Sequence, residues 1–116
     1  DLRADFCRLW HYMVLLPRYS VIENEVIEQV AGVLGALGNR TRLRIVKLIA
    51  ETDKPLHIKA LSRALKVRYS AIYRHVVTLK KAGIATVHEV GRSRVVALKH
   101  QKELSDLLRI ATQFTK

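Results

Sequence analysis

A helix followed directly by a β-hairpin constrains the fold of this chain more than any other feature. Ile72, Val76 and Leu79 recur at helical spacing, which predicts a helix over 69–82 with one buried face. Gly83 is expected to cap this helix at its C-terminus. Two short β-like runs come next, so we expect the helix to pack beside a hairpin.

The hairpin is predicted from the runs 84–90 and 94–98, which are joined at Gly91-Arg92-Ser93. Upstream of the long helix, the pattern predicts a short helix over 59–65 and a short strand over 56–58. Helix, turn, helix and hairpin in this order are typical of a winged helix-turn-helix.

Four further amphipathic helices are expected, over 2–16, 21–37, 40–51 and 101–114. Ser20 with Glu23 forms a capping box for the second of them, and Asn39 is expected to cap the third. We therefore expect a mainly α (α+β) fold. It would be a winged helix-turn-helix with a two-stranded hairpin wing and extra helices at both ends.

Composition limits where such a chain can act. With 116 residues, 49% of them hydrophobic, the chain is expected to form one folded domain. A single cysteine cannot form an internal disulfide, which favours a reducing, cytoplasmic setting. Within the cytoplasm, the chain is expected to be nucleoid-associated. No run is long enough for a membrane span, and no signal peptide is recognised. Because the sequence begins at Asp1, we expect that residues precede it in a longer protein.

The positive charge is concentrated in the middle of the chain. Residues 54–102 hold twelve Lys or Arg and one acid, Glu89, so this window carries 12 − 1 = +11. Both flanks, 1–53 and 103–116, are neutral, so the window holds the whole net charge. A basic surface of this kind favours binding to a polyanion, because each neutralised phosphate releases counterions. A merely solubilising surface is the alternative.

Two stretches resemble ArsR-type winged-helix repressors. Residues 37–45 read LGNRTRLRI, which is similar to the family's entry motif. Residues 65–84 run from LKVRYSAIYRHV to LKKAGI, which is similar to its recognition helix and to the segment leading into the wing. The resemblance covers roughly 33–99. It implies a homodimeric transcriptional regulator that binds double-stranded DNA and represses by occluding a promoter.

The recognition helix is expected to present its polar side chains to DNA: Arg68, Tyr69, Ser70, Tyr73, Arg74 and His75. Arg74 is assigned a hydrogen-bonding role, either to guanine or to a phosphate. Tyr73 contacts a thymine methyl or a phosphate, or else packs half-buried under the wing.

Arg68 departs from the family pattern, which usually has serine at the helix N-cap. Arginine cannot accept hydrogen bonds from the free N–H groups of the first turn. Either the helix starts later, at Ser70, or Arg68 is kept for a phosphate contact despite a weaker cap.

The wing is expected to contact the flanking minor groove through Arg92, Ser93 and Arg94. An ordinary charged hairpin tip is the alternative. Candidate contacts to the DNA backbone are Lys59, Arg63, Lys80 and Lys81. Arg40, Arg42 and Arg44 are not counted among these contacts, because one of them is expected to pair with an acid in the body.

No metal site, cofactor or effector is predicted. The helix before the recognition helix lacks the paired thiolates that ArsR-type sensors often use. His100 and Asp106 near the last helix lack the partner spacing of a second family site. Cys7 and His11 are four residues apart and could form half a site across a dimer, but such pairs are more often structural. No catalytic constellation is recognised, so we expect a non-enzyme.

The neutral flanks are expected to form a dimer body, with 1–20 and 101–116 as dimerisation segments around a DNA-binding unit over 21–100. The apolar residues assigned to the interface are Leu2, Phe6, Leu9, Trp10, Met13, Leu104, Leu107, Leu108 and Phe114. Pairing across a two-fold axis would suit an inverted-repeat operator. The alternative is that these side chains complete the protomer's own core.

Two other functions compete with a sequence-specific regulator. An architectural, chromatin-like protein would coat DNA through phosphates with little sequence preference, which the strong charge also allows. A winged helix can instead serve as a protein-interaction module in a larger assembly. Such a module would have little affinity for DNA at physiological salt, and the +11 charge of residues 54–102 argues against that. RNA binding is disfavoured because no aromatic stacking platform is recognised.

Overall fold

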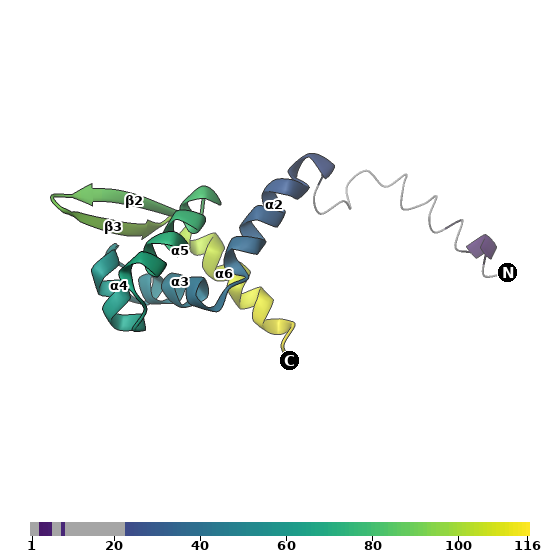
Figure 1. The fold of residues 1–116 in the computed structure, drawn as a ribbon. Coiled ribbons are helices and arrows are strands. Elements are labelled where there is room, and N and C mark those ends of the chain that lie inside the picture. The colour runs from purple at the N-terminus through teal and green to yellow at the C-terminus, as the bar shows by residue number, and fades with distance from the viewer. Residues whose placement is uncertain (1–2, 6–7, 9–22) are drawn as a thin grey trace.

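The computed structural model describes residues 3–5, 8 and 23–116, and from residue 23 onward helices pack around a small sheet (Figure 1). The helix expected over 2–16 lies outside the described residues except for 3–5 and 8, which are helical, and Ser20 also lies outside them. The elements in chain order are α2 (Asn24–Leu37), α3 (Arg40–Thr52), β1 (Leu56–His57), α4 (Ile58–Leu65), α5 (Tyr69–Lys81), β2 (Ala85–Val90), β3 (Ser93–Leu98) and α6 (Gln101–Gln113).

These bounds agree with the expected elements to within a few residues, and the end of α5 shows where they differ. The C-cap is Ala82, and Gly83 follows it with a φ of +80°. The amide of Gly83 donates to Lys80 O and that of Ile84 to Leu79 O, both at 3.0 Å. This pair of bonds is a Schellman motif, in which glycine takes the left-handed position after the cap. The expectation that Gly83 itself is the cap was therefore wrong by one residue.

The three strands form one antiparallel sheet in the order β1-β3-β2. β2 and β3 form the hairpin, with Val90 opposite Ser93, so the turn between them contains only Gly91 and Arg92. Gly91 has a φ of +63°, which a two-residue hairpin turn favours at its first position. β1 adds a short third strand beside β3, with Leu56 opposite Val96.

The core lies between the helices and the inner face of the sheet. The expected inner face of α5 is confirmed, since Ile72, Val76 and Leu79 have no exposed surface. Leu104 of α6 is only 8% exposed and packs in the same core, so it completes the protomer where we expected a dimer contact. Leu43 of α3 faces outward from this core and is 37% exposed.

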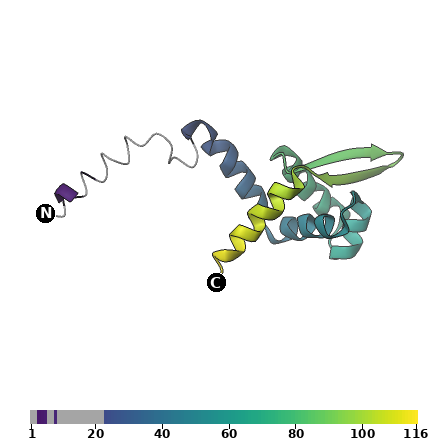
Figure 2. The ribbon, with the colours of Figure 1, turned by 180° about the vertical axis from the view of Figure 1, so that it is seen from behind.

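α2 and α6 extend away from the wing. They lie close together beside the core and splay apart toward the start of α2 and the end of α6 (Figures 1 and 2). Several large apolar side chains on these two arms are exposed: Ile27, Leu34, Ile110 and Phe114. Phe114 is 86% exposed, so the protomer itself does not bury it.

Asn39 caps α3, as the sequence predicted. Its backbone is extended, and its Oδ1 accepts from the amide of Thr41 at 2.9 Å and from that of Arg42 at 3.1 Å. Two of the four amide groups left without helical partners are thereby satisfied.

Replacing Asn39 with alanine is expected to lower the free energy of unfolding by about 0.5–2 kcal/mol, because both amides lose their side-chain acceptor. Urea unfolding followed by circular dichroism measures the change. Asn39→Asp is the control, since aspartate keeps the acceptor oxygen and should restore most of the loss. Equal stability of the alanine variant and the wild type would contradict this role of the cap.

Candidate nucleic-acid interface

A short, internally bonded turn sets α5 against α4. Lys66 takes the left-handed conformation at a φ of 56°, and its amide donates to Ser62 O. The amide of Val67 also donates to Ser62 O, and Ser62 Oγ donates to Val67 O. These contacts join the last turn of α4 to Val67, two residues before α5, and so define the path of the chain between the two helices.

α5 starts at Tyr69, and Arg68 occupies the N-cap position without a side-chain hydrogen bond to the helix. The backbone carbonyl of Arg68 accepts from the amides of Ala71 and Ile72, so the first turn is formed. Of the two alternatives left by the sequence, the later start at Ser70 is therefore wrong. Arg68 stands at the helix end with its side chain exposed.

The outer face of α5 does not present all the predicted residues equally. Tyr69, Ser70 and Arg74 are exposed, whereas Tyr73 and His75 are half-buried. The Cζ atom of Arg94 lies 4.6 Å from the centre of the Tyr73 ring. Tyr73 thus packs under an arginine of the wing, as in the packing alternative weighed from the sequence.

His75 contacts the body of the protein. Arg42 Nη1 lies 3.3 Å from His75 Nδ1, so a neutral His75 would accept this hydrogen bond at Nδ1 and carry its proton on Nε2. Burial, and after it the positive charge of Arg42, lowers the pKa of His75 below its ordinary value of 6.5.

Arg42 ties α2, α3 and α5 together. Its Nε donates to Ala36 O and its Nη2 to Gly35 O at 3.5 Å, so it caps the carbonyls at the end of α2 while it reaches His75. The sequence predicted an acid as the partner of one arginine in this helix. Arg42 is not that arginine, because its partners are backbone carbonyls and a histidine, and sequence reasoning missed this connection.

The lowered pKa of His75 predicts a loss of stability in acid. The unfolded chain takes up this proton near pH 6.5, before the folded protein does, so the contribution is complete above that pH. It is lost as the pH falls from 6.5 through the lower folded pKa. We expect the drop in unfolding free energy between pH 7.5 and 5.5 to be smaller in His75→Gln than in the wild type.

Unfolding in urea at the two pH values measures this difference. His88→Gln is the matched control, because His88 is exposed on β2 and its removal should leave the drop unchanged. An equal drop in the wild type and in His75→Gln would contradict the assignment.

The wing divides its arginines between two environments. Arg92 lies in the turn and is exposed, whereas Arg94 lies on β3 opposite Glu89. Arg94 Nε is 3.9 Å from Glu89 Oε1, and the guanidinium also covers Tyr73. The expected minor-groove contact therefore suits Arg92 better than Arg94. Ser93 is half-buried at the first position of β3.

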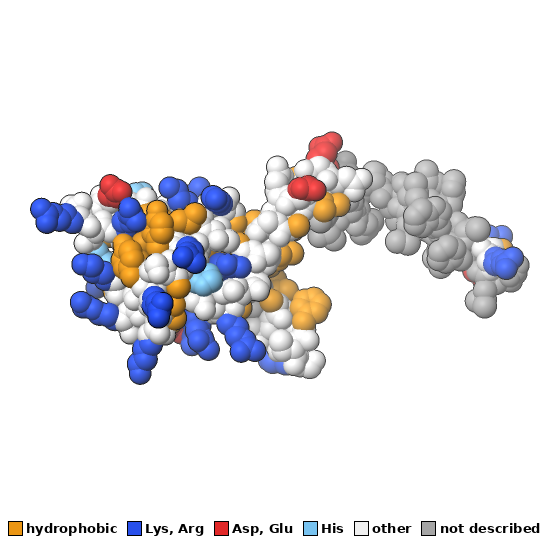
Figure 3. Space-filling model, viewed as in Figure 1, with side chains coloured by type: hydrophobic (Ala, Val, Ile, Leu, Met, Phe, Trp, Pro, Cys, Tyr) orange, Lys and Arg blue, Asp and Glu red, His pale blue; other side chains and the backbone are white. Residues whose placement is uncertain are grey.

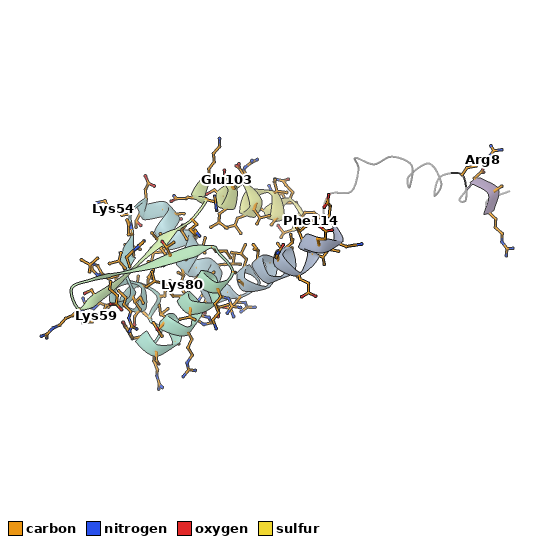
Figure 4. All side chains as sticks on the ribbon, turned by 90° about the horizontal axis from the view of Figure 1, so that it is seen from above. Arg8, Lys54, Lys59, Lys80, Glu103 and Phe114 are labelled. Atoms are coloured by element: carbon orange, nitrogen blue, oxygen red, sulfur yellow. The ribbon has the colours of Figure 1, made fainter. Side chains whose placement is uncertain are left out.

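The four candidate backbone contacts are all exposed but fall into two groups. Lys59 and Arg63 lie on α4 and line a surface hollow with Ser62 and Tyr69. Lys80 and Lys81 lie at the other end of α5, about 17–18 Å along the helix from Tyr69 at 1.5 Å per residue. Figure 4 shows Lys59 at the wing end of the molecule and Phe114 on the side away from the wing.

Basic side chains dominate this end of the surface. Figure 3 shows Lys and Arg side chains over the wing, α4 and α5, whereas most of the acidic side chains in this view lie over α2. The exposed polar residues of α5 and the exposed turn of the wing therefore share a strongly positive region. An anion long enough to touch both fits this arrangement.

Other kinds of site receive no support from the part of the chain that the structure describes. Within residues 3–5, 8 and 23–116, no three His, Cys, Asp or Glu side chains gather as metal ligands. Among the helices so described, none has the length and apolar character to cross a membrane. Cys7, His11 and the expected interface residues Leu2, Phe6, Leu9, Trp10 and Met13 lie outside the described residues.

Comparison with known proteins supports the same architecture. Residues 37–88 match the family described as a helix-turn-helix domain. Among solved structures, HlyU from Vibrio cholerae is 19% identical with a TM-score of 0.66, and the match covers 82% of this chain and 100% of HlyU. NolR from Sinorhizobium fredii is 19% identical with a TM-score of 0.65, covering 78% and 88%. None of the curated proteins matches this chain well enough to count as a relative.

A third solved structure is the homodimeric winged helix-turn-helix DNA-binding domain of Mb0332 from Mycobacterium bovis, a possible ArsR-family transcriptional regulator. It is 22% identical with a TM-score of 0.69, and the match covers 81% of this chain and 87% of that one. The fold predicted from the sequence is thus confirmed. The chain has a winged helix-turn-helix fold similar to those of HlyU and Mb0332, and its residues 37–88 are similar to the helix-turn-helix domain family.

Proposed function

We propose that this chain is a transcriptional regulator that binds double-stranded DNA sequence-specifically as a homodimer. The observation that carries the proposal is that the exposed half of α5, the turn of the wing and α4 share one basic surface. A helix with an apolar back face and polar side chains at its exposed N-terminal half suits the width of the major groove. The helix-turn-helix match over 37–88 supports the same function.

The residues of this surface take different roles in the proposal. Tyr69, Ser70 and Arg74 face the base edges, and Arg68 holds a phosphate at the start of α5. Arg92 enters the flanking minor groove from the turn of the wing. The lysines and arginine at the two ends of the surface hold the DNA backbone: Lys59, Arg63, Lys80 and Lys81. Tyr73, His75 and Arg94 position these elements from half-buried sites.

The homodimer is proposed from the two arms at the opposite end of the molecule. Ile27, Leu34, Ile110 and Phe114 expose apolar surface there, on helices that reach beyond the core. Leu107 and Leu108 of α6 are only half-buried and add to the same surface, whereas Leu104 is taken up by the core. A two-fold pair would set two copies of α5 about 34–36 Å apart, one DNA turn, and match an inverted repeat.

Repression is proposed as the direction of regulation, through occlusion of a promoter by the bound dimer. The site of action would be the nucleoid in the cytoplasm. A homodimer in solution is testable by sedimentation of the purified chain, and a monomer at micromolar concentration would contradict the two-fold arrangement.

The function is tested by recovering sheared genomic DNA with the purified protein at ~150 mM salt and sequencing it, because phosphate contacts alone weaken steeply with salt. We expect a few sharp peaks that share an inverted repeat. Uniform coverage would overturn the sequence-specific regulator and favour an architectural protein, the second candidate, which the +11 charge of residues 54–102 also suits. No recovered DNA would contradict both.

A further inference from the structure

We propose that Glu89 limits the phosphate affinity of the DNA-binding surface by holding Arg94 away from phosphate. The inference rests on the proposed DNA-binding function. Glu89 is the one acid among residues 54–102, beside twelve Lys and Arg. An acid at this place opposes binding to any DNA, so its position needs a reason beyond general charge.

The contacts of Glu89 connect the wing to α5. Glu89 lies opposite Arg94 in the β2–β3 register, and Glu89 Oε1 is 3.9 Å from Arg94 Nε. The Arg94 guanidinium in turn lies 4.6 Å from the centre of the Tyr73 ring. Glu89, Arg94 and Tyr73 thus form one chain of contacts from the edge of the wing to the recognition helix.

The location of the carboxylate brings it close to bound DNA. A surface hollow between the start of α5 and the wing is lined by Tyr69, Glu89, Arg92 and Arg94, among others. The side chain of Glu89 is 76% exposed and that of Arg94 is 40% exposed. Exposed ion pairs of this kind add little to stability, so the pair is better explained by its effect on DNA than by its effect on folding.

The consequence is a penalty that applies to all sequences alike. While Arg94 contacts Glu89 and Tyr73, the wing has one cation fewer available to bind DNA phosphates. The Glu89 carboxylate also repels the DNA backbone. DNA that offers only phosphates then binds weakly. An operator that also offers base contacts to α5 keeps enough affinity to be bound, and the ratio of operator to random binding is unchanged because the penalty is common to both.

Glu89→Gln tests this with two probes, a random-sequence duplex and a duplex selected from a random library by the wild-type protein. Release of Arg94 to one phosphate should steepen the slope of log K against log salt by about 0.9 and raise the affinity for random DNA about fivefold near 0.15 M salt. The selected duplex should gain by the same factor, because the released Arg94 meets a phosphate on either duplex. Glu51→Gln is the matched control, because Glu51 also forms an exposed pair, with Lys47 at 3.6 Å, on α3.

Two results would overturn the proposal. One is an unchanged affinity and slope on random DNA in Glu89→Gln. The other is an equal gain from Glu89→Gln in the Arg94→Met background, because the carboxylate would then act by charge alone and not through Arg94. If selection yields no preferred sequence, the sequence-specific function fails, whereas the slope on random DNA still decides whether Glu89 restrains Arg94.

Discussion

Arg74→Ala is expected to lower the affinity for the selected operator by about 10- to 100-fold, while the affinity for random duplex changes much less. Arg74 is exposed on α5, one turn after Ser70, and α5 presents its buried residues to the core on the other side. An arginine there can hydrogen-bond guanine at two atoms, which contributes about 1–3 kcal/mol of discrimination. Titration of both duplexes at one salt concentration measures the difference.

Two variants separate a base contact from a phosphate contact. Arg74→Lys keeps the charge but loses the planar fork, so it should stay close to Arg74→Ala if the contact is to guanine. Lys81→Ala, at the far end of α5, should weaken all duplexes alike and reduce the salt slope by about one. If Arg74→Ala lowers the affinity for both duplexes equally, Arg74 contacts a phosphate, and other residues make the contacts to the bases.

Local patterns predicted the elements well because the signals for them are local. The spacing of Ile72, Val76 and Leu79 fixes the buried face of α5, and the side chain of Asn39 reaches amides only two and three residues away. The contacts of Arg42 were not predicted, because its partners lie on α2 and α5 and reach it only when these helices pack against α3. Nothing in the residues around Arg42 signals a carbonyl six positions upstream and a histidine thirty-three positions downstream.

The ion pair between Glu89 and Arg94 was not predicted, because the pattern in the sequence predicted a turn of the wing that is one residue too long. A turn of three residues, Gly91-Arg92-Ser93, was expected, but Ser93 pairs with Val90 and leaves two residues in the turn. With the two-residue register, Glu89 falls opposite Arg94, and the ion pair follows. A glycine at the first turn position was the signal that could have found it, because two-residue hairpin turns favour glycine there.

The core variant Leu79→Ala is expected to have the largest effect on stability, a loss of about 2–5 kcal/mol. Leu79 has no exposed surface, and its carbonyl also accepts the Schellman bond that ends α5, so the residue packs where α5 meets the sheet. Truncation removes three carbons of buried side chain and leaves a cavity that the surrounding helices fill only in part. The melting temperature should fall by roughly 10–25 °C.

Leu43→Ala is the matched control, since it makes the same substitution in a helix at a position that is 37% exposed. It should cost clearly less, about 1–2 kcal/mol, because more than a third of the residue is already in water. Both variants are compared at one protein concentration, since a dimer would make stability concentration-dependent. A loss under 1 kcal/mol for Leu79→Ala would contradict its place in the core.

Operator binding and stability, measured on both Leu79→Ala and Arg74→Ala, should show that each variant affects only one of the two properties. At a temperature where Leu79→Ala is still folded, its recognition face is intact, so it should bind the operator close to wild-type affinity. Arg74→Ala should show the reverse, with wild-type stability and lost preference. This separation follows because Leu79 faces the core and Arg74 faces solvent on the same helix. If both variants lost stability and preference together, α5 would not hold its shape independently of the residues that read DNA.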